Sequence, residues 1–236
     1  MSDTLYLSMW YPNLRIASLP DKLTAVLSEF AGHGGEARVY AATVWPISWT
    51  ESPVFQRVYG KGERGAEPRF AVAEALELLH DDYAYEFQIG WSLWEREAGI
   101  GLITGPGNAG PLRQAQGRLS TPPSLRSGSS QDDNSLGRWV REPRLVRVTG
   151  YGPLFDEGSF EADGHIRLDF GLDAPFLEED AELDSVAARH VEENVRQLVA
   201  LTTAVEKASG ATARLLWSEL GESLAQRLAA RLGVRN

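Results

Sequence analysis

A long stretch of the chain, residues 105–137, has almost no large apolar side chains and is rich in Gly, Pro, Ser, Gln and Arg. Such a segment cannot bury enough apolar surface to offset the entropy of ordering its backbone, about 1–2 kcal/mol per residue. We therefore predict a disordered, low-complexity insertion or linker between an N-terminal α+β part (residues 1–104) and a C-terminal α+β part (residues 138–236). The two parts either fold separately or form one continuous domain.

The origin of this insertion has two interpretations. Its composition resembles translated repetitive DNA, in which case the function does not depend on it. The alternative is an arm that folds on a partner.

Hydrophobic periodicity predicts the fold class of the remaining chain. Residues 83–93 alternate between large apolar and mostly polar or small side chains, which is typical of an antiparallel strand with one buried face. Further strands are predicted at 4–11, 37–49, 144–150 and 211–217, and helices at 19–30, from 68, at 184–209 and at 223–232. Together they predict an α+β fold, with helices packed on a mixed, largely antiparallel sheet, or two similar α+β halves.

A hairpin is predicted at residues 159–170. The dipeptide Asp163-Gly164 separates two short β-prone runs, and Asp-Gly suits a tight turn that needs positive φ.

The chain is strongly acidic, and its acidic residues are concentrated in one region. The formal net charge is −10, which argues against nucleic-acid binding because phosphate contacts need Lys and Arg. Residues 151–193 hold thirteen Asp or Glu against two Arg. This acidic region is either a solvated face or a docking surface for a basic protein. Its candidate binding residues are Glu178, Glu179 and Asp180.

None of the catalytic or cofactor-binding motifs that we considered is complete in this sequence. The chain has no cysteine, which excludes disulfides, thiolate zinc sites and cysteine nucleophiles. Residues 60–65 match G-x-G-x-x-G, but long charged side chains fill the loop, and a flexible turn is the better interpretation. Asp169-Phe170-Gly171 lacks the other elements of a kinase site. We expect no cofactor and no metal, and we favour a non-catalytic protein.

Apolar runs are too short for a membrane helix, which needs about 18 residues. The start of the sequence also lacks the pattern of a secretory signal. We therefore expect a cytoplasmic protein with no membrane partner.

Two functional hypotheses follow. The leading one is a protein that binds a basic partner, as an inhibitor does, through the acidic region. The alternative is an enzyme or small-molecule binder with a pocket lined by Trp10 and Trp94, for which Glu86, His165 and Asp169 supply the polar groups. A homo-oligomeric structural protein is a third interpretation.

Overall fold

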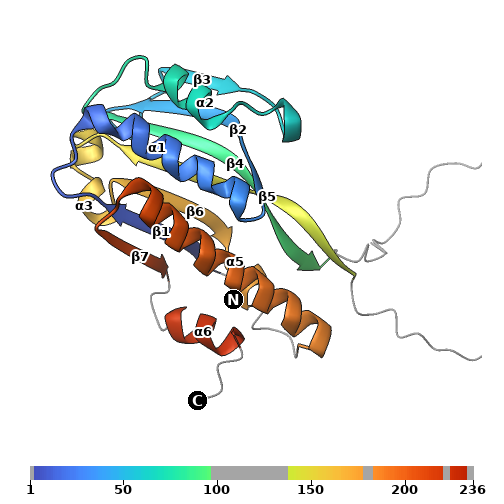
Figure 1. Ribbon diagram of the computed structural model, residues 1–236. Coiled ribbons are helices and arrows are strands. Elements are labelled where there is room, and N and C mark those ends of the chain that lie inside the picture. The colour runs from blue at the N-terminus through green and yellow to red at the C-terminus, as the bar shows by residue number, and fades with distance from the viewer. Residues whose placement is uncertain (1–2, 97–137, 178–182, 220–223, 233–236) are drawn as a thin grey trace, which may run out of the picture. The chain divides into compact units, whose positions relative to one another are not determined.

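A single antiparallel sheet of seven strands organises the protein. The computed structural model describes residues 3–96, 138–177, 183–219 and 224–232. The strands are β1 (Thr4–Trp10), β2 (Gly35–Pro46), β3 (Phe55–Val58), β4 (Tyr83–Arg96), β5 (Trp139–Tyr151), β6 (Ile166–Leu172) and β7 (Ala213–Ser218). Their order across the sheet is β3-β2-β4-β5-β6-β1-β7. The N-terminal strand β1 lies between β6 and β7 and pairs antiparallel with both, so strands from both parts of the chain share one sheet (Figure 1).

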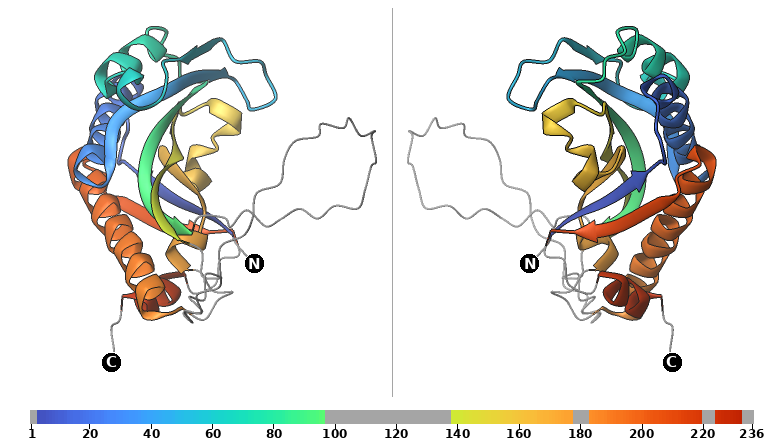
Figure 2. Two further views of the ribbon diagram at one scale, coloured as in Figure 1. Left: turned by 90° about the vertical axis from the view of Figure 1, so that its right-hand side faces the viewer. Right: turned by 90° about the vertical axis from the view of Figure 1, so that its left-hand side faces the viewer.

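Helices pack on the sheet, which confirms the predicted α+β fold. Within the described residues they are α1 (Leu19–Ser28), α2 (Pro68–Ala75), α3 (Phe160–Asp163), α4 (Ala174–Leu177), α5 (Ser185–Ser209) and α6 (Leu224–Arg231). Helices α1 and α5 lie side by side over one face, whereas α3 lies on the other side of the curved sheet (Figure 2). None of the described helices is long and apolar enough to cross a membrane.

The main core lies between the sheet and α1, α2 and α5. Alternate residues of each strand point into it, as the period of two requires. Trp91 of β4 is its largest fully buried side chain, and its ring packs against Phe30, Phe170 and Phe176 with centroid distances of 5.3–6.4 Å. Its indole nitrogen donates a hydrogen bond of 2.6 Å to the carbonyl of His33, so burying the indole leaves no polar group unsatisfied.

The long C-terminal helix predicted at 184–209 is confirmed as α5. The Asp184 carboxylate accepts hydrogen bonds of 2.8 Å from the backbone N–H groups of Val186 and Ala187, which are free at a helix start. Gly210 follows the last turn with φ of 70°, a conformation that glycine adopts without steric cost. Val195 and Leu198 on its inner stripe are fully buried.

The predicted hairpin at 159–170 is wrong. Residues Phe160–Asp163 form the short helix α3, and Gly164, with φ of 87°, ends that helix instead of forming a β-turn. Strand β6 pairs with β1 and β5. Tertiary packing decides this outcome, because Phe160 packs against the buried side chains of Tyr151 and Phe155.

The chain divides into two compact units, Met1–Glu95 with Arg141–Asn236, and Arg96–Val140. In the second unit the Arg96 guanidinium lies 5.6 Å from the centroid of the Trp139 ring. The insertion predicted at 105–137 lies outside the described residues.

Candidate functional site

The sheet surface turned away from α1, α2 and α5 is called the open face here. On it, residues of adjacent strands stand directly opposite one another in two rows across β5, β6, β1 and β7. The rows are Arg147, Asp169, Tyr6 and Trp217, and Thr149, Arg167, Ser8 and Leu215. Charged and aromatic side chains therefore lie side by side where an ordinary solvated sheet face would be uniformly polar.

Aromatic side chains close one end of the open face. A small cluster forms around Tyr151, Phe155 of the 3-10 helix η4 (Phe155–Glu157), and Trp49, which follows β2. The Trp49 ring lies edge-on to Phe155, with centroids 5.0 Å apart, and to Tyr151 at 6.1 Å. Trp45 packs on Trp49 at 5.8 Å. These contacts hold both indoles at the border of the charged rows.

The chain after β2 makes this arrangement possible through an unusual backbone conformation. Ile47 has φ of 60°, which is rare for a β-branched residue. Its N–H donates to the carbonyl of Asp82, and its carbonyl accepts from the N–H of Asp156, which also has positive φ. These two bonds hold the turn that carries Trp49 toward η4.

A groove lies between the aromatic cluster and the charged rows. Its volume is about 310 Å³, and it is lined by Tyr6, Trp45, Trp49, Glu86, Arg147, Thr149, Arg167 and Asp169. Six segments of the chain contribute to it, so the groove exists only in the folded protein. Its size is at the lower end of the range for small-ligand sites.

Both arginines of the groove are held by aspartates. Arg147 donates a hydrogen bond of 2.8 Å to Asp169, and Arg167 donates one of 2.6 Å to Asp163. The Arg167 guanidinium also lies 5.5 Å from the centroid of the Tyr6 ring and 5.7 Å from that of Tyr151. Each guanidinium thus has a carboxylate counter-ion within the protein.

Glu86 differs from the other charged groups of the groove. Burial raises its pKa above the ordinary value, although the positive charges of Arg147 and Arg167 and a hydrogen bond with Gln88 act in the opposite direction. Within the described residues it forms no ion pair within 4 Å. Glu86, Asp163 and Asp169 together with the two arginines carry a net charge of −1, and Glu86 is the group without a counter-ion. Its ionised form is therefore the least compensated charge at this site.

Trp45 contributes an unsatisfied hydrogen-bond donor next to this site. The indole nitrogen of Trp45 is buried and has no hydrogen-bond partner among the described residues. A buried donor without an acceptor costs about 1–3 kcal/mol.

The predicted site residues do not converge on one place. Glu86 and Asp169 line the groove. Trp10 lies away from it and donates its indole N–H to the carbonyl of Glu161 at 3.3 Å. His165 accepts a hydrogen bond of 3.2 Å from the backbone N–H of Tyr11 through Nδ1, and burial lowers its pKa, which favours the neutral ring that this bond requires. Glu178, Glu179 and Asp180 lie outside the described residues.

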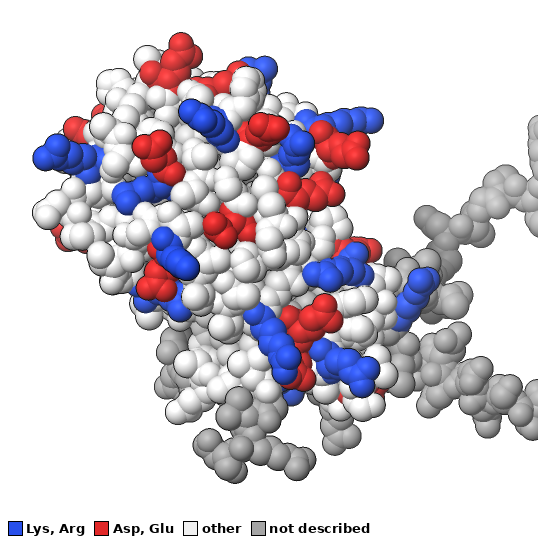
Figure 3. Space-filling view, in the orientation of Figure 1, with Lys and Arg blue, Asp and Glu red and all other residues white. Residues whose placement is uncertain are grey.

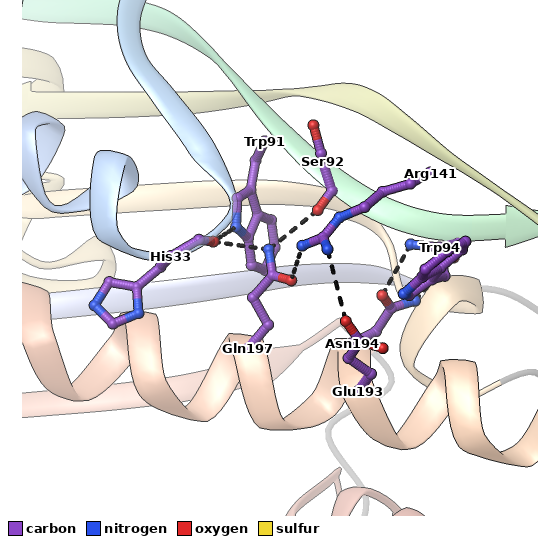
Figure 4. Close-up of polar contacts among 8 residues, drawn as sticks. All are labelled: His33, Trp91, Ser92, Trp94, Arg141, Glu193, Asn194 and Gln197. Carbon is purple, nitrogen blue, oxygen red and sulfur yellow. Dashed lines mark hydrogen bonds and ion pairs between the residues drawn. The ribbon is translucent and has the colours of Figure 1, made fainter.

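Trp94 belongs to a network that fastens the end of β4 to α5 (Figure 4). The buried Asn194 side chain accepts from the backbone N–H of Trp94 at 2.9 Å and donates to its carbonyl at 2.8 Å. Gln197 donates to the carbonyls of His33 and Ser92 at 2.7 and 3.1 Å. The contacts of Trp94 are those of a strand anchored to a helix.

Arginines pair with five of the nine acids of the acidic region that the structure describes. Ion pairs join Asp163 to Arg167, Asp169 to Arg147, Asp173 to Arg227, Glu192 to Arg196 and Glu193 to Arg141. Asp184 serves as the N-cap of α5. Figure 3 shows positive and negative side chains intermixed over the face that α1 and α5 cover. The excess of acids along the sequence therefore does not become a surface of one sign on that face.

Sequence analysis missed the arginines, Tyr6 and the tryptophan pair as members of one site. Arg147 and Thr149 do alternate with the buried Val146 and Val148, which was a usable signal for an outward-facing strand side. Which strands are neighbours depends on non-local pairing, and no local pattern gives it.

No group of three or more His, Asp or Glu within the described residues could hold a metal ion. Comparisons with protein-family models, with curated proteins and with solved structures found no match to this chain.

Proposed function

We propose that this protein is a non-catalytic binding protein and that its groove holds a cationic group of the partner. The observation that carries the proposal is Glu86, a half-buried carboxylate without an ion-pair partner among the described residues, in a groove walled by Trp45 and Trp49. A cation placed there gains a charge-assisted hydrogen bond with the carboxylate and attraction to the faces of the aromatic rings.

The two arginines do not cancel this preference. Arg147 and Arg167 are already bonded to Asp169 and Asp163 at 2.8 and 2.6 Å. The remaining charge of the site is the negative charge of Glu86. A positive group neutralises it, whereas an anion would place a second negative charge beside it.

The proposed partner is basic, as expected from the sequence, but it binds at the groove and not at the acidic region. A basic partner was expected at the acidic region, but ion pairs within the chain already engage many of those acids. Exposed ion pairs give little binding energy, since water and salt screen them. Glu86 is partly removed from water, so its interaction with a cation is screened less.

Titration with a small cation tests this function. The probe is N-acetyl-arginine methylamide, and the signal is the tryptophan fluorescence of the full chain, because Trp45 and Trp49 line the groove. We expect a dissociation constant on the order of 1 mM, as for one charged contact of about −4 kcal/mol. Glu86→Gln should weaken binding at least tenfold.

The matched control is Glu77→Gln, which removes the same charge from an exposed position outside the groove. It should bind the probe as the unaltered protein does. Binding should also weaken as salt is added. Equal affinity of the Glu86→Gln and Glu77→Gln variants would disprove the proposal.

A free organic cation is the second candidate ligand. The groove volume of about 310 Å³ favours it, because an isolated site of this size holds a small molecule. The residues next to the groove on the open face distinguish a basic side chain of a protein partner from a free organic cation.

A further inference from the structure

A second hollow lies on the open face. It has a volume of about 280 Å³, and its walls include Tyr40, Gly90, Pro143 and Leu145. Leu145 is 46% exposed although it is a large apolar side chain on a strand. Glu36 and Lys61 stand at the same hollow with opposite charges. The second hollow is therefore a mainly apolar site without a net charge from its two charged side chains.

Glycine shapes this hollow. A Cβ atom at Gly90 would lie 2.2 Å from the hydroxyl oxygen of Tyr40, so only glycine leaves room for that ring over β4. Tyr40 reaches this position because the pairing of β2 with β4 shifts register between Val39 and Ala41. Such a bulge turns two successive residues to one face.

The groove and the second hollow lie end to end along the same two strands. On β4, Glu86 and Gly90 both face away from the core, since Phe87, Ile89 and Trp91 between and beside them are fully buried in it. On β5, Arg147 belongs to the groove and Leu145 to the second hollow. Glu86 and Gly90 are four strand residues apart, which corresponds to about 13 Å.

This spacing matches an extended polypeptide. Side chains four positions apart in an extended chain point to the same side and are also separated by about 13 Å. An extended segment that runs along β4 places one side chain in each.

We propose that the open face binds an extended segment of another protein, with a basic side chain in the groove and a large apolar side chain, four positions away, in the second hollow. The inference rests on the proposed function and specifies its partner. Charge complementarity with Glu86 selects the basic residue, and the exposed Leu145 with the Tyr40 ring selects the apolar one.

Synthetic peptides test the spacing. The probes are acetylated and amidated peptides of about seven residues, built from threonine and serine with one arginine and one leucine. In one set of peptides leucine is four positions after arginine, and in the other set it is four positions before arginine. The control peptides have a spacing of three, which turns the two side chains to opposite sides of an extended chain. The better of the two spacing-four peptides should bind the full chain at least tenfold more tightly than its spacing-three control.

Two variants test whether the leucine side chain of the peptide occupies the second hollow. Leu145→Asn should weaken the spacing-four peptide about tenfold and leave binding of N-acetyl-arginine methylamide unchanged, because it removes the apolar side chain without adding a charge. Leu215→Asn is the matched control, because Leu215 is 53% exposed on β7 of the same face but lines neither hollow. Circular dichroism of each variant verifies that it is folded.

The outcomes separate this inference from the proposed function. Equal affinity for spacings of three and four, with binding still lost in Glu86→Gln, would overturn the peptide partner and leave the cation site. Binding of neither peptides nor the small cation would overturn both. A spacing preference that Leu145→Asn abolishes and Leu215→Asn preserves supports the inference.

Discussion

Arg147 and Asp169 stand directly opposite each other on β5 and β6, and their side chains form an ion pair of 2.8 Å. The Asp169 side chain is 13% exposed and that of Arg147 is 56% exposed, so the pair lies at the floor and rim of the groove. Because Asp169 occupies Arg147, the nearby Glu86 has no counter-ion of its own. The proposal that the groove holds a positive group rests on this relationship.

The stability of the protein should depend on the ionisation of Glu86. Burial raises its pKa in the folded state, so the folded state binds more protons than the unfolded chain between the two pKa values. The free energy of unfolding therefore falls as pH rises from the unfolded pKa of about 4.3 through the raised folded pKa. Glu86→Gln removes this loss. We expect its melting temperature at pH 8 to exceed that of the unaltered protein by up to about 2–4 °C.

The difference should shrink as the pH falls toward 4, which lies below both the unfolded and the raised folded pKa of Glu86. Thermal unfolding of both proteins between pH 4 and pH 8 measures this. The melting-temperature gain of Glu86→Gln over the unaltered protein should be larger at pH 8 than at pH 4. A gain that is smaller at pH 8 would contradict the assignment of Glu86 as a desolvated carboxylate.

Asn194 should be a major determinant of stability. It makes three hydrogen bonds to the backbone, two with Trp94 and one of 2.9 Å to the carbonyl of Pro175, and its side chain is fully buried. At about 1 kcal/mol for each bond, Asn194→Ala should lower the free energy of unfolding in urea by about 3 kcal/mol. Glu193→Ala, which removes an exposed ion pair on the same helix, should cost less than about 1 kcal/mol. Equal losses would show that the network in Figure 4 does not anchor β4.

Replacing Ile47 by a residue that tolerates positive φ should stabilise the protein. Its φ of 60° is unfavourable for isoleucine, and its side chain is 59% exposed, so little packing is lost on replacement. Asparagine tolerates this conformation. Ile47→Asn should raise the free energy of unfolding by about 0.5–1 kcal/mol. Val54→Asn, at a similarly exposed apolar residue without positive φ, should change it by less than about 0.5 kcal/mol. A loss of stability in Ile47→Asn would refute this explanation.

The elements of the fold follow from local patterns, but the site does not. The apolar stripe, the capping Asp184 and Gly210 are enough to predict α5, and strict alternation is enough to predict β4. Asp163-Gly164 misled the prediction, because a glycine with positive φ serves a helix end as well as a hairpin turn.

Glu86 and Asp169 were predicted as polar groups of a site because both lie on predicted strands. Their partners could not be predicted, since β1 enters the sheet between β6 and β7 and thereby brings Tyr6 next to Asp169. Trp94 was predicted to line a pocket together with Trp10. In the structure its ring packs on His190, with centroids 4.2 Å apart, a contact that no local pattern predicts.

Deletion of residues 107–135, with the ends joined by a short Gly/Ser linker, tests the sequence-based prediction of a passive insertion. Shortening a flexible connection changes the loop-closure entropy by only about 1 kcal/mol. The melting temperature should therefore change by no more than about 2–4 °C. A much larger fall in melting temperature would show that this segment packs against the rest of the protein.

The most direct test of the central claim is the pKa of Glu86, measured by NMR of its labelled carboxyl carbon and assigned with the Glu86→Gln variant. In the free protein the pKa should lie above its ordinary value, because the carboxylate is partly buried without a counter-ion. Saturation with N-acetyl-arginine methylamide should lower it, since a bound cation favours the ionised form. An ordinary pKa that the cation does not change would contradict the account.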